Sequence, residues 1–519
     1  MADYLWPVDI APSSQTWRIA DPAAVFTSPF TGAVRTVSRS GARMGCRISV
    51  PPLKGTDRAR LISVLANLRG KGNRIWVPDF STAQRGSFSA PELLANNTFS
   101  SGTSSWTYTA GANLSANDGR ARITYNGDPT EADIYNSSGL AVTQYAPYAL
   151  RAFVDRGSWA AANVIGPFFG HGSTQDTGYQ TSGGLLTARG VVTAAATGNL
   201  GIYGYQFGMS AGAYYETPWM SFARCALVDN GPNALTNSDD ASAWGGGGKT
   251  VTTNTAAAPD GTTTADTLTE DTSTGAHYLV VTGPTVSVAG QYTATIHVKR
   301  AVGVRNVDLI LGTTGSGNYV TAPFDLGSGT FSALGYGGSA TLGRAVATYM
   351  GNNWYAVTLT AWLPTAATRA DLQIVMNSGG TESYTGTTGA LYVWRASVAS
   401  SGSPVRPVQT TSSSTAGASQ TGSKLYLKGL PASTSGLLRV GDPVQIGSQI
   451  NFVTAPLDSN AAGLGTLQCG LPWRSSPADN DPVFINRPMA RMLLVSDDIN
   501  WDTQPGQVSP FEIDLIEDV

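Results

Sequence analysis

Only one segment of this chain repeats apolar residues with the period of an α-helix. Its buried face is predicted to consist of Leu61, Val64, Leu65 and Leu68. Thr56 is the predicted N-cap and Gly70 the predicted stop. The helical period does not return before residue 400. A chain of 519 residues must therefore build most of its cores from strands.

The composition also favours a β-sheet protein. The chain contains 60 glycines, charged residues make up 13% of it, and 41% of its residues are hydrophobic. Short alternating runs of β-branched and aromatic residues are separated by Gly, Asn and Pro, which is typical of strands joined by many turns. The length predicts roughly two to four domains.

Changes in composition divide the chain into five segments. Residues 1–92 have the pattern strand, helix, strand. Residues 93–232 and 233–400 have strand patterns only and are predicted to form two β-sandwich modules. The Ser/Thr/Gly-rich stretch 401–423 has the composition of a linker, and residues 424–519 return to strand patterns.

A weak internal repeat marks the start of each module. Leu94-Ala95-Asn96-Asn97-Thr98-Phe99 is followed by Trp106, and Leu235-Thr236-Asn237-Ser238-Asp239-Asp240 is followed by Trp244. The two openings are separated by about the length of a domain. We therefore expect two modules of related fold.

Charge and cysteine usage argue against several classes of function. The net charge is -3, and neither sign gathers into blocks, so nucleic acid is not an expected partner. Cys46, Cys225 and Cys469 are far apart and odd in number, which predicts buried thiols. The sequence has no apolar run that would span a bilayer and no signal-peptide pattern at its start, so we expect neither membrane insertion nor secretion by that route.

The two ends of the chain carry an ordered set of short motifs. At the front these are Trp17, Ser28-Pro29-Phe30-Thr31-Gly32, Pro51-Pro52-Leu53, Leu65-Ala66-Asn67-Leu68-Arg69-Gly70-Lys71-Gly72-Asn73 and Pro78-Asp79. At the back they are Lys428-Gly429-Leu430, Val440-Gly441-Asp442 and Ser509-Pro510-Phe511-Glu512-Ile513-Asp514. Taken together, the ends resemble minor tail proteins of tailed bacteriophages that are related to the distal tail protein.

This resemblance implies a virion protein of the tail tip, made in the host cytoplasm. It implies a homo-oligomeric ring, hexameric as in the family, with the tail tube protein and the tip hub protein as partners. It also implies one split domain built from both chain ends. That arrangement is physically reasonable, because neither end has enough strands alone and a loop tolerates a long insertion at a modest entropic cost.

The second module resembles carbohydrate-binding sandwich domains of phages and bacteria. The resemblance rests on residues 235–244, Pro259-Asp260-Gly261 and Gly351-Asn352-Asn353-Trp354-Tyr355. The first module shares the opening but has no equivalent of the Pro259-Asp260-Gly261 turn. The resemblance implies modules that face outward and attach the particle to host cell-surface polysaccharide.

Aromatic residues are the basis of the sugar-binding hypothesis. Sugar rings present apolar C–H faces that stack on aromatic side chains. The predicted contacts all lie in the first module and are Trp106, Tyr135, Trp159 and Tyr179. Trp219 and Trp354 stand in apolar strands and are predicted to belong to the core.

The sequence contains no recognisable catalytic or metal-binding motif. His171, His277 and His297 lack the spacing of metal ligands, so we expect no metal and no cofactor. Asp239, Asp240, Asp260 and Asp266 are too scattered for a calcium site. The run Gly245-Gly246-Gly247-Gly248 lacks the pattern of a phosphate-binding loop and is predicted to be a flexible turn. An enzyme would need a pair of carboxylates from the set Glu131, Asp133, Asp155 and Glu216 to converge on a glycan.

The sequence thus predicts an all-β-dominated, non-enzymatic protein. Its split β-sandwich or barrel-like tail domain, with one helix, is formed by the N- and C-terminal segments and carries two inserted jelly-roll-type β-sandwich modules. Two rival functions stay open at this point. One is a purely architectural tail protein that binds no sugar, and the other is a glycan-degrading tail enzyme.

Overall fold

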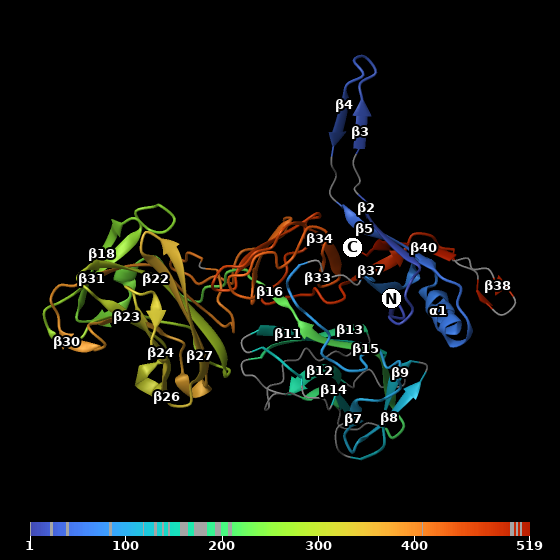
Figure 1. The fold of residues 1–519 in the computed structure, drawn as a ribbon, viewed down its shortest axis with the longest axis horizontal. Helices are drawn as coiled ribbons and strands as arrows, with labels where there is room; N and C mark the ends of the chain where they lie inside the picture. The colour runs from blue at the N-terminus through green and yellow to red at the C-terminus, as the bar shows by residue number, and fades with distance from the viewer. Residues whose placement is uncertain are drawn as a thin grey trace.

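The computed structural model is an all-β protein with one α-helix, arranged in several lobes (Figure 1). It describes residues 2–20, 24–37, 41–81, 86–117, 119–128, 132–136, 140–143, 146–155, 164–170, 184–192, 199–205, 210–406, 408–498, 503–504, 507–508 and 511–518. Over these residues, no helix is long and apolar enough to cross a membrane. The predicted fold class, a split domain with one helix and two inserted sandwich modules, is confirmed.

The two ends of the chain form one six-stranded sheet. In spatial order its strands are β1 (Asp3–Leu5), β6 (Arg74–Pro78), β37 (Met489–Leu494), β40 (Phe511–Glu517), β5 (Arg43–Val50) and β2 (Ser14–Ala20). The two C-terminal strands, β37 and β40, therefore lie in the middle of a sheet whose outer strands come from the N-terminal segment (Figure 1). We call this part of the protein the split body.

The core of the split body draws apolar side chains from both ends. In the pairing of β40 with β5, Ile513 lies opposite Ile48 and Leu515 opposite Cys46, and all four side chains are buried. Helix α1 (Gly55–Leu68) adds the predicted residues Leu61, Val64, Leu65 and Leu68 to the same cluster. The alternating apolar residues of the strands and the apolar face of α1 thus pack into one core.

The predicted start of α1 is wrong. The N-cap is Lys54, not Thr56, and no side chain caps the helix there. Gly55 begins the helix with a positive φ of 57°, which glycine adopts without strain. The predicted end is confirmed, because Arg69 and Gly70 both take left-handed backbone angles just after Leu68.

A second six-stranded sheet forms a nearly closed barrel beside the split body. Its strands in order are β33 (Pro443–Ile446), β34 (Gln449–Ala455), β35 (Gly465–Cys469), β32 (Lys424–Lys428), β16 (Ala226–Val228) and β36 (Pro482–Val483). A bridge between Gln445 and Phe484 links the two edges. Because β16 comes from the centre of the chain and Phe88 also enters the barrel core, this barrel, like the split body, is assembled from distant segments.

The first inserted module packs two sheets face to face. One contains β7 (Trp106–Tyr108), β10 (Ala132–Asn136), β14 (Asn199–Tyr205) and β12 (Val164–Gly170). The other contains β8 (Ala112–Asn117), β9 (Arg120–Tyr125), β15 (Tyr214–Arg224), β11 (Ala146–Asp155) and β13 (Gly184–Val192).

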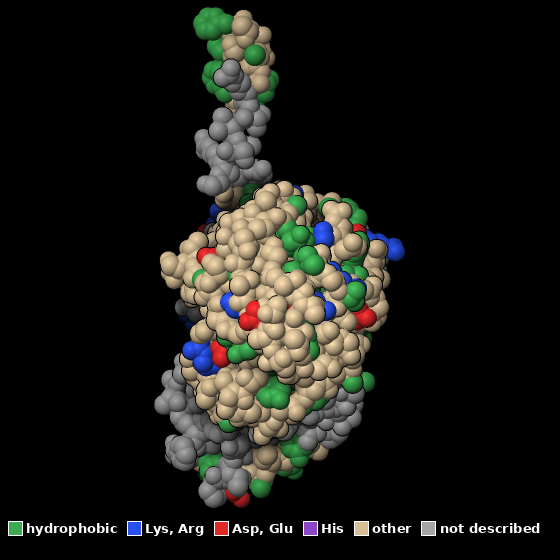
Figure 2. Space-filling view, turned by 90° about the vertical axis from the view of Figure 1, so that its left-hand side faces the viewer, with side chains coloured by type: hydrophobic (Ala, Val, Ile, Leu, Met, Phe, Trp, Pro, Cys, Tyr) green, Lys and Arg blue, Asp and Glu red, His purple; other side chains and the backbone are tan. Residues whose placement is uncertain are grey.

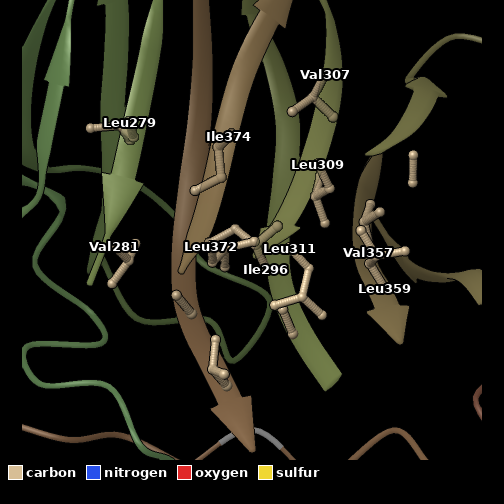
Figure 3. Close-up of a cluster of buried hydrophobic side chains, with 14 of the residues drawn as sticks. Leu279, Val281, Ile296, Val307, Leu309, Leu311, Val357, Leu359, Leu372 and Ile374 are labelled. Carbon is tan, nitrogen blue, oxygen red and sulfur yellow. The ribbon is translucent and has the colours of Figure 1, made fainter. Parts of the chain in front are cut away.

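The second inserted module is a larger sandwich. Its seven-stranded sheet contains β17 (Gly245–Gly247), β21 (Tyr278–Val281), β29 (Leu372–Asn377), β23 (Asn306–Thr313), β24 (Asn318–Asp325), β25 (Thr330–Phe331) and β26 (Gly335–Gly337). The opposing sheet contains β18 (Lys249–Ala256), β19 (Ala265–Glu270), β31 (Ala390–Ala399), β22 (Gly290–Val302), β28 (Trp354–Leu363) and β27 (Thr341–Gly351). Leucine, isoleucine and valine side chains from both sheets fill the space between them (Figure 3).

The two modules share one strand topology. The order β7-β10-β14-β12 matches β17-β21-β29-β23, and β8-β9-β15-β11-β13 matches β18-β19-β31-β22-β28. The matched strands also follow in the same order along the chain. The second module adds strands β24 to β27 between the counterparts of β12 and β13. The predicted relation between the modules therefore extends from their openings to the whole sandwich.

The repeated opening makes the same hydrogen bond in each module. The indole Nε1 of Trp106 donates to the carbonyl oxygen of Asn96 at 3.1 Å, and that of Trp244 donates to Asn237 at 2.9 Å. Both asparagines have left-handed backbones, with φ values of 49° and 50°. Asparagine tolerates this conformation better than most residues. The sequence repeat therefore encodes a turn whose carbonyl oxygen faces the buried tryptophan.

The first module is fixed against the barrel by a buried arginine. Arg151 has 1% of its surface exposed. Its Nη2 donates to the carbonyl oxygen of Asn486 at 2.6 Å and its Nη1 to Oε1 of Gln445 at 3.1 Å. Its guanidinium carbon lies 4.2 Å from the ring centre of Phe484. A buried cation needs partners of this kind, so this contact sets where the module sits.

Parts of the stretch 401–423 are buried, whereas residues 411–414 are exposed. Val405 is buried, the backbone nitrogen of Arg406 donates to Asp229, and the Gln420 amide donates to Asn230. Thr410 hydroxyl donates to the carbonyl oxygen of Leu235 at 2.8 Å. Small polar side chains resemble a linker in composition, but here hydrogen bonds hold them against the chain that enters the second module.

Replacing Leu515 by alanine tests the split body. Leu515 is fully buried on β40, so Leu515→Ala is expected to lower the free energy of unfolding by about 2–5 kcal/mol. Differential scanning calorimetry of the full chain measures the shift. Glu512→Ala, at an exposed position on the same strand, is expected to change it by less than about 0.5 kcal/mol. Equal effects of the two changes would contradict this account of the core.

Replacing Asn237 tests the turn shared by the modules. Asn237→Ala is expected to destabilise the second module by about 1 kcal/mol, because a Cβ without a compensating amide opposes the left-handed backbone. Asn237→Gly, which accepts that backbone freely, is expected to stay close to wild type. Thermal melting of the two variants compares them directly. A glycine variant less stable than the alanine variant would argue against a backbone cause.

Candidate functional site

The described residues that were predicted to bind sugar in the first module fall on different sides of one sheet. Trp106 is 6% exposed and packs on Phe99, with ring centres 5.1 Å apart, so its ring belongs to the core. Tyr135 is half-buried and follows Ile134, a core residue, so it faces the opposite side of the sheet. Trp159 and Tyr179 lie outside the described residues. Trp219 and Trp354 are buried, as predicted.

The corresponding side of the second module is the outer face of the seven-stranded sheet. Leu279, Ile374 and Leu309 point into the sandwich (Figure 3), so their neighbours along the strands point outward. The strand registers align these outward residues in rows. The face consists of Tyr278, Val280, Asp308, Ile310, Tyr319, Thr321, Pro323, Gln373, Val375 and Asn377.

Each of the two tyrosines on this face lies opposite a glycine of the neighbouring strand. Tyr278 pairs with Gly247 of β17, where an added Cβ would come within 3.2 Å of ring atom Cε1. Tyr319 pairs with Gly337 of β26, where an added Cβ would come within 2.6 Å of Cε1. Glycine in a strand often marks such a close approach. The absence of side chains beneath the rings lets them lie low over the sheet.

The glycine run at residues 245–248 is therefore not the flexible turn that its composition predicted. Gly245–Gly247 forms edge strand β17 in register with β21. A Cβ at Gly246 would come within 2.1 Å of the Tyr278 carbonyl oxygen. Glycine is required here because the neighbouring strand approaches too closely for any side chain.

Polar groups lie between and beside the tyrosines. The Gln373 amide donates to the Thr314 hydroxyl at 3.0 Å, and the Asn377 amide donates to Oδ2 of Asp308 at 2.9 Å. The half-buried Gln373 amide and the tyrosine rings match the chemistry that sugar recognition uses: hydrogen bonds to hydroxyls and an apolar ring face. Asn377 is 5% exposed, and its amide is held within the protein by Asp308 and Gly380. Half-buried Tyr278, Tyr319 and Gln373 keep part of their surface in solvent.

One carboxyl group on the face has a perturbed pKa. Asp308 is 3% exposed. Burial raises the pKa of Asp308 to about 6, and the hydrogen-bonded carboxyl of Glu382 also raises it, whereas Asn377 lowers it. The Asp308 carboxyl is therefore costly to ionise, and it lies in the same row of the face as Tyr278.

The remaining titratable candidates have structural partners. Arg395 pairs with Asp239 at 3.0 Å, and backbone nitrogens of Ala241 and Asn254 donate to Asp266. Within the described ranges, no cluster of three or more His, Cys, Asp or Glu side chains could hold a metal ion. All three cysteines are buried and free, as predicted.

The two described histidines are also buried. Burial lowers the pKa of His297 to about 4, and its Nδ1 faces the Arg395 carbonyl oxygen at 3.2 Å. His277 lies between the carbonyl oxygens of Gly248 and Tyr384. His171 lies outside the described residues. Both described rings therefore fit a structural role.

The carboxylates that an enzyme would need are only partly described. Glu216 on β15 is 8% exposed and pairs with Arg122 at 2.6 Å. The strand register places Asp155 opposite Glu216. Glu131 lies outside the described residues, and Asp133 is described only as part of β10. Glu216 is thus engaged in an ion pair on the strand surface.

Sequence reasoning did not single out Tyr278 or Tyr319. Their alternation with core residues was visible, but alternation marks every strand of the module. The informative signal was that each tyrosine lies opposite a glycine on a neighbouring strand. That signal depends on the register of strand pairing, which the sequence alone does not reveal.

Comparisons with known proteins find similarity to carbohydrate-binding modules. A CBM22 tandem from Xyn10C of Paenibacillus barcinonensis is 14% identical and matches 62% of this chain and 100% of its own, with a TM-score of 0.22. A second structure, of carbohydrate-binding modules of the β-sandwich superfamily with promiscuous specificity, is 13% identical and matches 57% of this chain and 96% of its own, with a TM-score of 0.19.

A third similar structure contains the M60 catalytic domain with two CBM51 domains of Clostridium perfringens ZmpB. It is 8% identical and matches 73% of this chain and 43% of its own, with a TM-score of 0.16. TM-scores of this size carry no argument about the fold or function of this chain. No protein-family model matches the chain, and no curated protein matches it in sequence.

The raised pKa of Asp308 predicts a stability effect with a defined sign. The folded protein holds this proton more tightly than an unfolded chain, whose aspartates titrate near ~3.9. The stabilisation is therefore complete below that pH and is lost as pH rises through about 6. Asp308→Asn keeps a neutral side chain at every pH. Its melting temperature minus that of wild type is therefore expected to be larger at neutral pH than in mild acid.

Asp325 on the same sheet provides a matched control. Its pKa is lowered, first by the hydrogen bond from the Gly327 backbone and further by Arg300. The stability that ionised Asp325 contributes to the folded protein is present at neutral pH and is lost in acid. Asp325→Asn is therefore expected to lower the melting temperature at neutral pH. Melting curves of both variants over a pH series check the two signs, and a shift of the same sign in both would refute the assignment for Asp308.

Proposed function

We propose that this protein is a structural component of a bacteriophage tail tip that also attaches to host glycans. Copies of the split body form a closed ring, hexameric by resemblance, between the tail tube protein and the tip hub protein. The protein is made in the host cytoplasm and acts in the virion, without catalysing a reaction. The observation that carries the proposal is the assembly of both chain ends into one body from which the modules extend.

A projecting hairpin on the split body supports a role in assembly. Strands β3 (Ala24–Thr27) and β4 (Val34–Val37) extend away from the lobes (Figures 1 and 2). Four of its large apolar side chains are exposed: Phe30 at the turn is 96% exposed, and Val25, Phe26 and Val34 are each more than half exposed. An isolated two-stranded ribbon is marginally stable in water, and such a concentration of exposed apolar residues is typical of a protein contact.

The outer face of the seven-stranded sheet supports glycan attachment. Tyr278 and Tyr319 offer ring faces to sugars, and the half-buried Gln373 amide lies on the same face. Single sugar contacts of this kind are weak. In a ring, several copies of the face would engage one cell surface together, and avidity would make the attachment effective.

Changes in the hairpin test the assembly role. Phe26→Ser combined with Phe30→Ser is expected to shift the full chain from oligomer to monomer, because the apolar contact is lost while the body stays intact. Size-exclusion chromatography with light scattering measures the mass. Val288→Ser, at a 73% exposed position in the second module, is the control and is expected to leave the mass unchanged. A wild-type protein that is monomeric at all concentrations would contradict the ring.

Changes on the outer face test glycan attachment. Tyr278→Ala and Tyr319→Ala are each expected to weaken binding of the full chain to glycans by about tenfold, since a well-placed aromatic contact contributes on the order of 1.4 kcal/mol. A glycan array on the wild type identifies the ligand, and titration calorimetry compares the variants. Tyr349→Ala, a 58% exposed tyrosine away from this face, is expected to bind like wild type.

The two rival functions give distinct results. A purely architectural protein would bind none of the glycans on the array. A glycan depolymerase would release new reducing ends from host polysaccharide. Either outcome would overturn the proposed attachment by binding alone.

A further inference from the structure

The two tyrosines of the outer face stand far apart on the sheet. Tyr278 lies on β21 and Tyr319 on β24, with β29 and β23 between these strands. The register pairs Tyr278 with Val375, and Val375 with Asp308. Asp308 in turn pairs with Pro323, which is four residues from Tyr319 on β24. The tyrosines are therefore separated by three strand spacings across the sheet and by four residues along the strands.

This separation corresponds to several sugar residues. Strands lie about 4.8 Å apart and rise about 3.4 Å per residue, so the two tyrosine Cα atoms are on the order of 20 Å apart. A sugar ring in an extended chain spans roughly 5 Å between its glycosidic oxygens, given single bonds of about 1.5 Å. A single sugar or a disaccharide is therefore too short to contact both rings. An extended chain of about five sugars is long enough to stack on both.

The straight path between the tyrosines crosses two paired side chains. Gln373 on β29 pairs with Ile310 on β23, and both lie on this path. Ile310 is 6% exposed, so little of it stands above the sheet. Gln373 is half-buried, and its amide nitrogen donates to the Thr314 hydroxyl at 3.0 Å. An extended chain that runs from one tyrosine to the other therefore passes over an apolar side chain and one amide.

Both edges of this face lack side chains. The outward positions are Gly245 and Gly247 on edge strand β17, and Gly335 and Gly337 on edge strand β26. A site that binds only the terminal sugar of a chain needs walls that enclose that sugar. Bare backbone beside each tyrosine supplies no such wall. A chain can therefore continue past both edges of the sheet.

We propose that the outer face binds an internal stretch of a straight, β-1,4-linked polysaccharide, about five sugars long, with a tyrosine stacked near each end of the stretch. This inference rests on the proposed glycan attachment and specifies its ligand. The linkage follows from shape, because β-1,4-linked chains of glucose, mannose or xylose are extended. Chains of α-1,4-linked glucose coil and leave the straight path between the two rings.

The test measures the affinity of the full chain as a function of ligand length by titration calorimetry. The probes are cello-, manno- and xylo-oligosaccharides from dimer to octamer, which are neutral because the face has no lysine or arginine. Malto-oligosaccharides are the matched control, since they differ from cello-oligosaccharides only in linkage. In at least one β-1,4-linked series, affinity is expected to rise about tenfold between trimer and hexamer, when the second tyrosine is reached. The malto series is expected to show no such rise.

Variants connect the length dependence to the two rings. Tyr278→Ala and Tyr319→Ala are each expected to remove the rise, so that trimer and hexamer bind alike. Tyr349→Ala, at an exposed tyrosine away from this face, is expected to keep it. Titration with a long polymer of the same sugar gives the number of protein copies bound per chain, and an internal site predicts many copies.

The outcomes separate this inference from the proposed function. Full affinity already with the dimer, or one protein copy per chain however long the polymer is, would refute the inference. Binding to glycans on the array but to none of the β-1,4-linked series would also refute it and leave glycan attachment standing. Failure to bind any glycan on the array would overturn both. A rise with length that each tyrosine variant removes would support the inference.

Discussion

The rest of this structure depends on one constraint. The last strand, β40, lies in the middle of a sheet whose outer strands come from the first part of the chain. β40 hydrogen bonds to β5 on one side and to β37 on the other. Near its end, the fully buried Glu517 accepts hydrogen bonds from the backbone nitrogens of Met44 and Ile450 and pairs with Arg474. The split body is complete only when both ends meet, so everything between them must leave this body and return to it.

The inserted modules are held in place by buried polar contacts. Arg151 fixes the first module against the barrel. For the second, the side chain of Asn233 joins the incoming and outgoing segments: its amide donates to Ala396 and Val408, and its oxygen accepts from Leu235 and Val398. A module attached in this way presents its outer face in a fixed direction. Fixed presentation lowers the entropic cost of several copies binding together.

The two modules share a fold but differ at the proposed binding face. Both have the same matched strands and the same tryptophan-to-asparagine turn. The edge strand β7 of the first module carries Trp106, Thr107 and Tyr108, whereas its counterpart β17 consists of glycines. The strand that seats Tyr319, β26, belongs to the strands that only the second module adds. The glycine-seated tyrosines are thus features of the second module.

The sequence by itself determined the features that depend on local pattern. The helical period identified the buried face of α1, strand alternation and glycine content predicted an all-β chain, and the repeat at Asn96 and Asn237 predicted two related modules. Local pattern was less reliable where a partner decides the outcome: Lys54 rather than Thr56 is the N-cap of the helix, and Trp106 lies in the core.

Features that depend on the pairing of strands distant in sequence were decided only by the tertiary structure. The register placed Tyr278 opposite Gly247 and Tyr319 opposite Gly337, and it brought Asp308 to the amide of Asn377. Folding also buried Val405, Thr410 and Gln420 in a stretch whose composition is that of a linker. The physical reason is that a side chain's face and exposure follow from which strand lies beside it, and that neighbour is often hundreds of residues away in the sequence.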